Sequence, residues 1–536
     1  MDEVTPPANL DQVELILVVQ DETVMFQHDG ERWSWQELGG SANLNSKGAG
    51  AGYHISGFLS EKVGVMTITQ EEWEAYLETI TDPEVRARVE KAADFHKAHT
   101  TEDPKDGHLR ANVTMFIGAK RSSPLHPSGY WTGNDVYLQL DHVISIFEIR
   151  HPGKKGVFLF DNSTGHGKMA SDALLVECLN KLPGGKVVTK LRETTWMDAG
   201  GGEHTQSFVF KEGDELLYDA KNVRANPLDS NGAVCFPEGD SVEAQMPGEN
   251  KYTKNVTVVS REHDNTYTLR FPLMGDEVVG GVGVASMRVP AVTFKKGDVP
   301  PELIGHSKGS MQILLERGLI DESSKLVGKC GAKEKEKLKA AKRASGIGVG
   351  ESTDVPAHAG WTDGAPCCLE FLLSQQPDFK AQRNAIEELL ASRGHLCIFL
   401  PKFHPELNCI ERYWSRVKWH ARQYCDGTLR GLKKTADESL VMSPETCDLP
   451  QIRRYFRTAW RWIDAYSRGL DGKLAEYAVR KSKSHRCVTE AVDREVNFPT
   501  EERDARMIAR ASTERTAVPT ALTDVDVACS MSDIDD

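Results

Sequence analysis

Residues 136–161 read VYLQLDHVISIFEIRHPGKKGVFLFD, an amphipathic segment that leads directly into a short apolar one. Apolar residues recur at helical intervals over residues 136–150, and the following HPGKKG, with its proline and glycines, ends that pattern. The next run, GVFLFD, has the length of a buried strand and ends at Asp161. A helix that leads into a strand is typical of an α/β fold, and the segment therefore predicts one.

Other apolar runs extend this pattern along the chain. The run VELILVVQ, residues 13–20, is rich in β-branched residues and predicts a buried strand that ends directly at Asp21. Two shorter strand candidates, residues 32–36 and 53–60, complete a predicted antiparallel unit. The remaining expected elements are a helical segment at 71–98, an amphipathic helix at 379–393, a buried strand at 395–401, a helix that begins after Pro405 and a helix at 451–468.

The chain, at 536 residues, is long enough for two or three structural units. Its character changes near residue 206, where short Val, Thr and Phe runs alternate with turn-forming residues, and this change predicts a β-rich insertion. The expected division is an α/β core in two parts, 1–205 and 301–425, with the insertion at 206–300, a basic helical region at 426–487 and a disordered acidic tail at 488–536.

Composition and charge exclude several classes of protein. With 39% hydrophobic and 27% charged residues the chain is neither fibrous nor globally disordered, and no run approaches the about 20 apolar residues that span a bilayer. The acidic N-terminus lacks the pattern of a secretory signal, and the 11 cysteines fit reduced thiols inside the cell. The net charge is -14, but residues 401–487 hold 18 Lys and Arg against 10 Asp and Glu. This local +8 is compatible with DNA binding at one face or with a solvated helical surface.

Three carboxylates are candidates for a catalytic metal site. Asp21 and Asp161 each follow a predicted strand, so we expect both at strand tips, and Glu411 lies one to two turns into the helix after Pro405. Carboxylate oxygens are the ligands that Mg²⁺ prefers, and a group of three supplies the charge that a two-ion phosphodiester reaction needs. Taken singly, each residue has another explanation, because aspartates commonly begin turns and helical glutamates are commonly solvated.

The segments around these carboxylates read QDETVMFQHDG (20–30), GVFLFDNSTGH (156–166) and LPKFHPELNCIERYW (400–414). All three resemble the corresponding segments of mariner-type DDE transposases, in a divergent lineage common in fungal genomes. The third segment is the most specific, because its order of Pro, acidic residue, Leu, Asn, Ile, Glu and Trp is long and fixed. The similarity covers about three quarters of the chain and also includes GYWTGND, HPGKKG, LNKLPGGK, LLERGL, SQQPDF and RWIDAYSRGL.

The resemblance implies a fold, an activity and a cofactor. The fold would be RNase H-like, a mixed sheet flanked by helices, and residues 1–205 and 301–425 would form its catalytic domain. Asp21, Asp161 and Glu411 would be the catalytic triad that binds Mg²⁺ (or Mn²⁺) for cleavage and strand transfer of DNA. The expected location is the nucleus, and the expected partners are DNA and a second copy of the chain in a homodimer.

The sequence also departs from the family pattern. Many relatives have Asp at the position of Gly57 and Pro at the position of Cys409, and the 250 residues between Asp161 and Glu411 require large insertions. The helix-turn-helix region that usually precedes the first catalytic strand is not seen before Asp21, so sequence-specific binding to transposon ends is not expected. The alternative function is therefore a catalytically silent, domesticated nuclear protein that binds DNA or proteins. A third is an RNase H-like nuclease with a cellular RNA or repair substrate.

Further polar and basic residues are candidates for contacts with nucleic acid. His166 lies near Asp161 and is either a phosphate-positioning or an ordinary loop histidine, and Asn408 lies on the same side as Glu411. In residues 451–468, arginines alternate with aromatic residues, and we expect Ile452, Phe456, Trp460 and Ile463 to form the packed face. The candidate DNA-binding residues are His166, Asn408, Lys418, Arg453, Arg454, Arg457 and Arg461.

Cysteines in one region raise the separate question of a zinc site. Cys330, Cys367 and Cys368 are the candidate ligands, with Cys397 or His395 as a fourth. Adjacent cysteines lack the two-residue spacer of a zinc knuckle, so buried thiols are the default interpretation.

Overall fold

The computed structural model describes two compact units. Unit 1 comprises residues 1–168 and 384–536, and unit 2 comprises residues 169–383. The described residues are 13–29, 49–99, 108–117, 131–185, 191–198, 200–229, 233–247, 251–262, 266–272, 277–329, 368–482 and 486–496.

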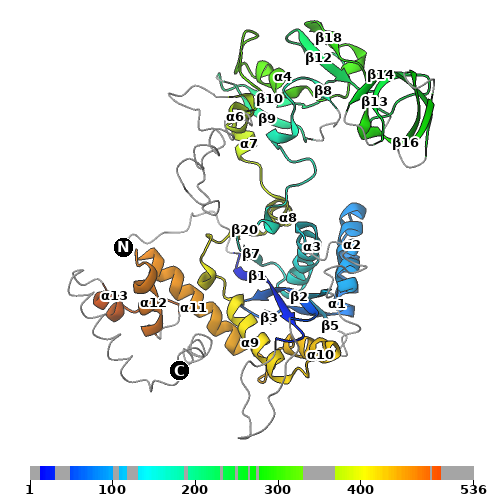
Figure 1. Ribbon diagram of the computed structural model, residues 1–536. Helices are drawn as coiled ribbons and strands as arrows, with labels where there is room; N and C mark the ends of the chain where they lie inside the picture. The colour runs from blue at the N-terminus through cyan, green and yellow to red at the C-terminus, as the bar shows by residue number, and fades with distance from the viewer. Residues whose placement is uncertain are drawn as a thin grey trace, which may run out of the picture. The chain divides into compact units, whose positions relative to one another are not determined.

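A six-stranded mixed sheet forms the centre of unit 1 (Figure 1). The strand order is β20-β7-β1-β2-β3, and β6 also pairs with β2. β1, β7 and β20 are parallel to one another, whereas β2 is antiparallel to β1, β3 and β6. Helices flank the sheet, which confirms a mixed α/β fold. The strands are β1 (Leu15–Phe26), β2 (Gly52–Ser60), β3 (Gly64–Val65), β6 (Val113–Ile117), β7 (Lys155–Phe160) and β20 (Leu396–Phe399), and a separate pair is β4 (Thr67–Thr69) with β5 (His108–Arg110).

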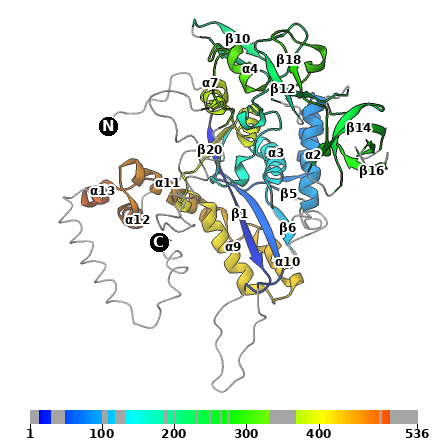
Figure 2. The same ribbon diagram turned by 45° about the horizontal axis from the view of Figure 1, so that its top comes forward.

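Each face of the sheet packs against its own set of helices (Figure 2). Successive residues of a strand point to opposite faces, so Val18 joins one core and Val19 the other. The Val18 core contains residues of α1 (Gln70–Thr79), α2 (Pro83–His99), α3 (Gly133–Arg150) and α8 (Ala385–Ser392). The Val19 core contains residues of α9 (Ile410–Tyr424), α10 (Leu429–Ser439) and α11 (Leu449–Ser467).

Several predicted elements differ from the observed ones at their ends. The expected helix at 71–98 is two helices, α1 and α2, because the chain leaves the helix at Ile80 and restarts at Pro83. The expected helix at 379–393 is likewise divided into α7 (Pro377–Lys380) and α8, which begins with an Asn384 capping box. The strand expected at 32–36 lies outside the described residues.

Unit 2 is larger than the predicted 206–300 insertion. It begins at residue 169 and ends at residue 383, because the residues on both sides of the predicted insertion share one core, including Leu174, Leu314 and Leu369. A second core belongs to a five-stranded antiparallel sheet of order β16-β15-β14-β13-β17. The strands of that sheet are β13 (Ser241–Gln245), β14 (Tyr252–Arg261), β15 (Thr266–Phe271), β16 (Glu277–Gly283) and β17 (Met287–Arg288).

The rest of unit 2 consists of short elements. Its helices include α4 (Gly309–Glu316) and α6 (Leu369–Ser374) in addition to α7, and its other strands form two- and three-stranded sheets. These strands are β8 (Gly184–Gly185), β9 (Thr194–Met197), β10 (Glu203–Gln206), β11 (Glu215–Leu216), β12 (Ala220–Ala225), β18 (Val292–Phe294) and β19 (Gly297–Asp298).

The basic C-terminal region is helical, as expected, but its packed face is shorter than predicted. Ile452 and Phe456 are fully buried in α11, whereas Ile463 is 37% exposed, because the buried core of the sheet reaches only to Ala459 and the end of α11 packs through Ala465 in a separate core. α12 (Gly472–Lys481) and α13 (Glu490–Val496) follow and share a core with the end of α11. The predicted start of the disordered tail at residue 488 is therefore too early, because α13 extends to Val496. The residues beyond 496 lie outside the described part.

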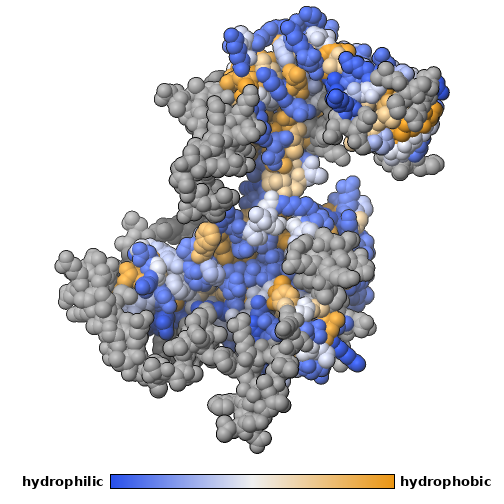
Figure 3. All heavy atoms as spheres, viewed as in Figure 1, coloured by the Kyte–Doolittle hydropathy of each residue, from blue (hydrophilic) through white to orange (hydrophobic). Residues whose placement is uncertain are grey.

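The described surface shows no apolar span. No helix in the described ranges has both the length and the apolar composition needed to cross a bilayer. On the face of the molecule seen in Figure 3, hydrophilic residues predominate in unit 1 and apolar residues occur in small groups.

We predict that unit 1 folds without unit 2. The chain leaves and re-enters unit 1 at neighbouring points, since the Ala385 N–H donates to the Lys168 carbonyl oxygen at 2.8 Å, and each unit has its own core. Replacing residues 170–382 by a short Gly-Ser linker should give a monodisperse protein with one cooperative urea transition. Aggregation of this variant, or loss of its near-ultraviolet circular dichroism, would show that unit 1 depends on unit 2.

Candidate functional site

Asp21 lies within a strand rather than at its tip. β1 continues to Phe26, because β2 pairs with it along its whole second half, and Asp21 lies opposite Gly57. The predicted end of the strand at Gln20 was therefore wrong. Asp21 shares the face of Val19, which packs on α9, and the Trp414 indole N–H of that helix donates to Asp21 Oδ2 at 3.1 Å.

Asp161 directly follows β7, as predicted, and is paired with His166. The His166 ring is only 1% exposed, and its Nδ1 lies 2.6 Å from Asp161 Oδ1. Nδ1 also lies 3.1 Å from both the Asp161 carbonyl oxygen and Ser163 Oγ, so its single hydrogen is shared. The other ring nitrogen, Nε2, lies 3.3 Å from Glu22 Oε1. His166 therefore joins the loop after β7 to β1.

Glu411 lies in the first turn of α9, earlier in the helix than predicted. The helix begins at Ile410, directly after a 3-10 turn at Pro405–Leu407. Asn408, which is buried, precedes the helix, and its Nδ2 donates to the Gln20 carbonyl oxygen at 3.0 Å. This bond fixes the start of α9 beside β1, one residue before Asp21. Asn408 thus has a positioning contact within the protein.

The three predicted carboxylates interact with one another. Burial, followed by the charge of Glu411, raises the pKa of Asp21 to about 8, and Asp161 contributes in the same direction. Burial also raises the pKa of Glu411, with a further contribution from Asp161, and Asp21 is a hydrogen-bond partner of Glu411. The three side chains, from distant parts of the sequence, are therefore close enough to influence one another electrostatically, although Asp161 is paired with His166.

His166 offsets part of this negative charge. Burial alone would lower the pKa of His166, but hydrogen bonds with Asp161 and Glu22 raise it to about 10. The ring is therefore an imidazolium ion at neutral pH. The same contact lowers the pKa of Asp161, which stays ionised. The position of His166 near Asp161 in the sequence made it a candidate, but the contact of His166 with Glu22 could not be predicted from the sequence.

The donor atoms suit a hard divalent cation, although the present side-chain positions do not form a complete ligand set. Within the described ranges, no group of three or more His, Cys, Asp or Glu side chains is arranged to hold a metal ion. Asp161 faces His166, and Asp21 faces Glu411. Asp161 Oδ1 is occupied by the His166 ring at 2.6 Å, so a cation at this place would have to compete with that imidazolium ion. Oxygen donors of this kind fit Mg²⁺ or Mn²⁺.

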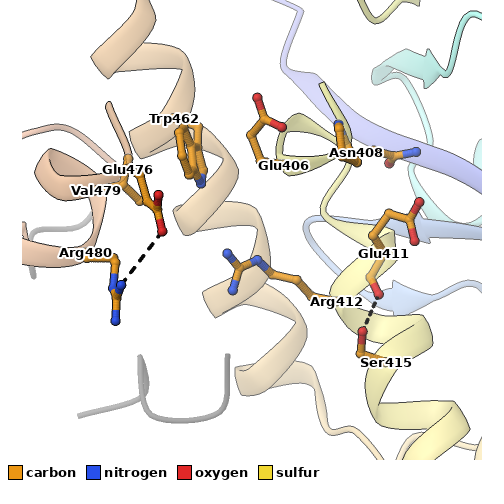
Figure 4. A pocket seen from close by; sticks show the side chains of 10 residues that line it. Glu406, Asn408, Glu411, Arg412, Ser415, Trp462, Glu476, Val479 and Arg480 are labelled. Atoms are coloured by element: carbon orange, nitrogen blue, oxygen red, sulfur yellow. Dashed lines mark hydrogen bonds and ion pairs between the residues drawn. The ribbon is translucent and has the colours of Figure 1, made fainter. Parts of the chain in front are cut away.

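A pocket of about 430 Å³ lies beside Glu411 (Figure 4). In this view Arg412 and Glu411 leave neighbouring positions of α9 in different directions, with Arg412 directed toward α11. Trp462 of α11 and the Glu476–Arg480 pair of α12 form the opposite side. The pocket thus combines basic, aromatic and acidic side chains next to the third carboxylate. Its lining residues are Pro405, Glu406, Asn408, Glu411, Arg412, Ser415, Trp462, Glu476, Val479 and Arg480.

The predicted DNA-contacting cations have different surroundings. Lys418 lies two turns after Glu411 on α9, and its charge acts on the Glu411 carboxylate. Arg453 and Arg454 are exposed, and Arg453 donates to the Lys62 carbonyl oxygen at 2.7 Å. Arg457 is half-buried. Arg461 is directed to the Ser482 carbonyl oxygen at 2.9 Å, which gives it a contact that joins α11 to the end of α12.

The candidate zinc ligands do not form a described site. Cys330 and Cys367 lie outside the described residues, and Cys368 is fully buried in unit 2, where its sulfur accepts from the Phe371 N–H. Cys397 and His395 belong to unit 1. His395 accepts from the Gly156 N–H at 3.1 Å and contacts Glu148, so its contacts hold β20 beside β7.

Sequence reasoning missed the contact between Trp414 and Gly57. A Cβ atom at Gly57 would lie 2.6 Å from Trp414 Cη2 and 2.9 Å from Cζ2, so the indole occupies the space of a side chain. Gly57 itself was the available signal in the sequence: it lies opposite Asp21 in the β1–β2 pair, and the Trp414 indole occupies the space beside it while donating to Asp21.

Comparisons of the chain with protein-family models, with curated proteins and with solved structures found no match.

We predict that Asp21→Asn stabilises the metal-free protein at high pH. The folded pKa of about 8 lies above the unfolded value near 4. The stability that protonated Asp21 provides is therefore present below about pH 4 and lost as the pH rises through 8. Asparagine retains an oxygen for Trp414 and carries no charge. In EDTA at pH 9, the variant should melt higher than the wild type by roughly 2–4 °C, the shift that about 1 kcal/mol produces in a domain near this size.

The wild type and Asp21→Asn are compared with each other at each pH. His166 titrates in both proteins, so its effect on stability is removed from the difference. The advantage of Asp21→Asn should grow from pH 5 to pH 9 in thermal melts. A constant difference over this range would contradict the raised pKa of Asp21.

We also predict that Gly57→Ala and Trp414→Leu are strongly coupled. The added methyl group meets the indole, so Gly57→Ala should lower the free energy of unfolding by about 1–3 kcal/mol. With leucine at position 414 this loss should largely disappear. Urea unfolding of both single variants and the double variant measures the coupling, and additive losses would show that the indole does not press on Gly57.

Proposed function

We propose that the chain is a transposase-derived endonuclease of the DDE superfamily, which cleaves and transfers DNA strands with a divalent metal ion. One observation carries this proposal: Asp21 and Asp161 each lie two residues after the paired Val19 and Leu159 of the parallel strands β1 and β7, and Asn408 holds the start of α9, which bears Glu411, against Gln20. Acidic residues repel, so a fold that gathers three of them needs a compensating partner. A divalent cation bound by oxygen ligands is such a partner.

The architecture of unit 1 supports an RNase H-like fold. Its mixed sheet has helices on both faces, and the three carboxylates come from two adjacent parallel strands and the first turn of the helix after the third. These are the features that the resemblance to mariner-type transposases implies. The proposal places the nuclease in unit 1 and leaves unit 2 as an insertion between the second and third carboxylates.

In the proposed reaction, Asp21, Asp161 and Glu411 would hold Mg²⁺ or Mn²⁺. Such ions activate the attacking oxygen and stabilise the leaving oxygen of a phosphodiester. The residues of the chain keep the ligands in place: Trp414 orients Asp21, His166 orients Asp161, and Asn408 fixes the start of α9. Release of Asp161 from His166 would free a second oxygen for the ion, while the Ser163 contact retains the ring.

The surroundings of Glu411 support a nucleic-acid substrate. Lys418 and Ser415 follow Glu411 on α9, and Arg412, Trp462 and Arg480 line the adjacent pocket. Arginine and lysine bind phosphates, and an indole ring can stack on an unpaired base. We therefore propose DNA as the partner, the nucleus as the location and a homodimer as the form that joins two DNA ends.

A second candidate function is a catalytically silent protein that retains the fold to bind DNA or proteins. The observation that favours it is the state of Asp161, which is paired with His166 rather than grouped with the other two carboxylates. In this alternative His166 permanently provides the positive charge that the ion provides in an active enzyme.

We predict that purified protein cleaves labelled DNA with Mg²⁺ or Mn²⁺, and that Asp161→Asn and Glu411→Gln each reduce the rate at least 100-fold, because one missing ligand disrupts a carboxylate-held ion. Glu71→Gln, which neutralises an exposed carboxylate of α1, is the matched control and should cleave at the wild-type rate.

Two results decide between the candidates. Cleavage that persists in both site variants would come from another source and would end the enzymatic proposal. DNA binding without cleavage, equal in the wild type and both variants, would favour the silent protein.

A further inference from the structure

Phe403 is the most exposed large apolar side chain in the described part of the chain. It is 94% exposed, whereas the next most exposed, Met197, is 62% exposed. Its backbone is also unusual, with a φ of 67°, a left-handed conformation that bulky residues rarely adopt. An aromatic ring thus stands in solvent on a backbone that disfavours it, and no packing contact within the protein compensates. Strained conformations of this kind are concentrated at functional sites.

The loop that carries Phe403 is attached to both strands that bear the aspartates. At its start, the Leu400 N–H donates to the Phe160 carbonyl oxygen at 2.8 Å, one residue before Asp161. At its end, Asn408 donates to the carbonyl oxygen of Gln20, one residue before Asp21. The loop therefore connects two points next to the proposed catalytic carboxylates, and Phe403 lies between these points in the sequence.

Further contacts hold the base of this loop. The His404 ring packs edge-on against Tyr466 of α11, with 5.4 Å between ring centroids. Glu406 accepts from the Tyr466 hydroxyl at 2.6 Å and lies 2.7 Å from His404 Nδ1. Of the two residues next to Phe403, His404 is therefore anchored and Lys402 is exposed. The anchored His404 holds the base of the loop, and Phe403 stands exposed beside it.

We propose that Phe403 is a wedge that stacks on an unstacked base of the DNA, next to the bond that unit 1 cleaves. The proposal rests on the proposed nuclease function. A single ring on a rigid loop suits insertion at a base step, where apolar side chains separate neighbouring bases. Lys402 beside it supplies a positive charge for the adjacent phosphate. An apolar protein partner would instead be expected to meet a wider apolar patch, and Phe403 is flanked by Pro401, Lys402 and the half-buried His404.

The experiment measures DNA binding by full-length protein with Ca²⁺, using fluorescence anisotropy on a duplex that ends in a short single strand. A 2-aminopurine base at the junction reports unstacking by a rise in fluorescence. Phe403→Ala and Phe403→Leu should bind roughly 5- to 150-fold more weakly and lose the rise, since base–aromatic stacking has about this effect on the dissociation constant. Phe403→Tyr should restore both within about threefold of wild type.

Two further variants separate the wedge from a structural role. Phe403→Gly accepts the left-handed backbone without strain, so it should melt at or above the wild-type temperature while binding as weakly as Phe403→Ala. Val441→Ala removes another exposed apolar side chain of unit 1, 41% exposed, and should leave binding and fluorescence unchanged.

The outcomes also distinguish this proposal from the proposed function. If Phe403→Ala binds, unstacks and cleaves as the wild type does, the wedge is refuted and the nuclease stands. If the wild type binds and unstacks DNA through Phe403 but never cleaves it, the nuclease fails and the wedge stands. A wild type that does not bind DNA, or a Phe403→Ala variant whose only change is the loss of a dimer in analytical ultracentrifugation, overturns the wedge.

Discussion

The mutual repulsion of Asp21, Asp161 and Glu411 is the constraint on which the arrangement of unit 1 depends. Each carboxylate alone would be stable in water, and bringing them together costs free energy that the surrounding contacts must offset. The structure does this in three ways. Asp21 is held in its protonated form, with a pKa of about 8, and receives the Trp414 hydrogen bond. Asp161 is neutralised by His166, and Glu411 remains at the surface near Lys418.

These compensating contacts explain features that would otherwise be unrelated. Position 57 is glycine because the Trp414 ring crosses it to reach Asp21. Asn408 is buried because its bond to Gln20 sets where α9 begins. Unit 2 begins at residue 169, just after the loop in which His166 joins Asp161 to Glu22. Unit 2 thus enters the chain only after the residues that contact the second carboxylate.

Local patterns in the sequence were sufficient for much of the fold of unit 1, and they named the three carboxylates of the proposed site. The periodicity of residues 136–150 and the apolar runs before Asp21 and Asp161 correctly predicted α3, β1 and β7. The length of β1 could not be predicted, because the polar residues Asp21, Glu22 and Thr23 interrupt its apolar pattern and the strand continues through them by pairing with β2. The extent of unit 2 depends on residues that share a core although they are distant in sequence. The contacts of Trp414 with Asp21 and of Glu22 with His166 depend on the same kind of long-range packing.

The pairing of His166 with Asp161 and Glu22 also bears on the metal-dependent function that we propose. An ion at this place would meet an internal imidazolium ion that already neutralises one of the acidic ligands. If an ion binds, Asp161 would have to leave His166 and Asp21 would have to lose its proton, and both changes would oppose binding. The Glu22 and Ser163 contacts hold the ring in place when Asp161 leaves, so the rearrangement is confined to one carboxylate. The contacts of His166 therefore stabilise the present arrangement without an ion, and in the proposed function they would confine the change on ion binding to Asp161.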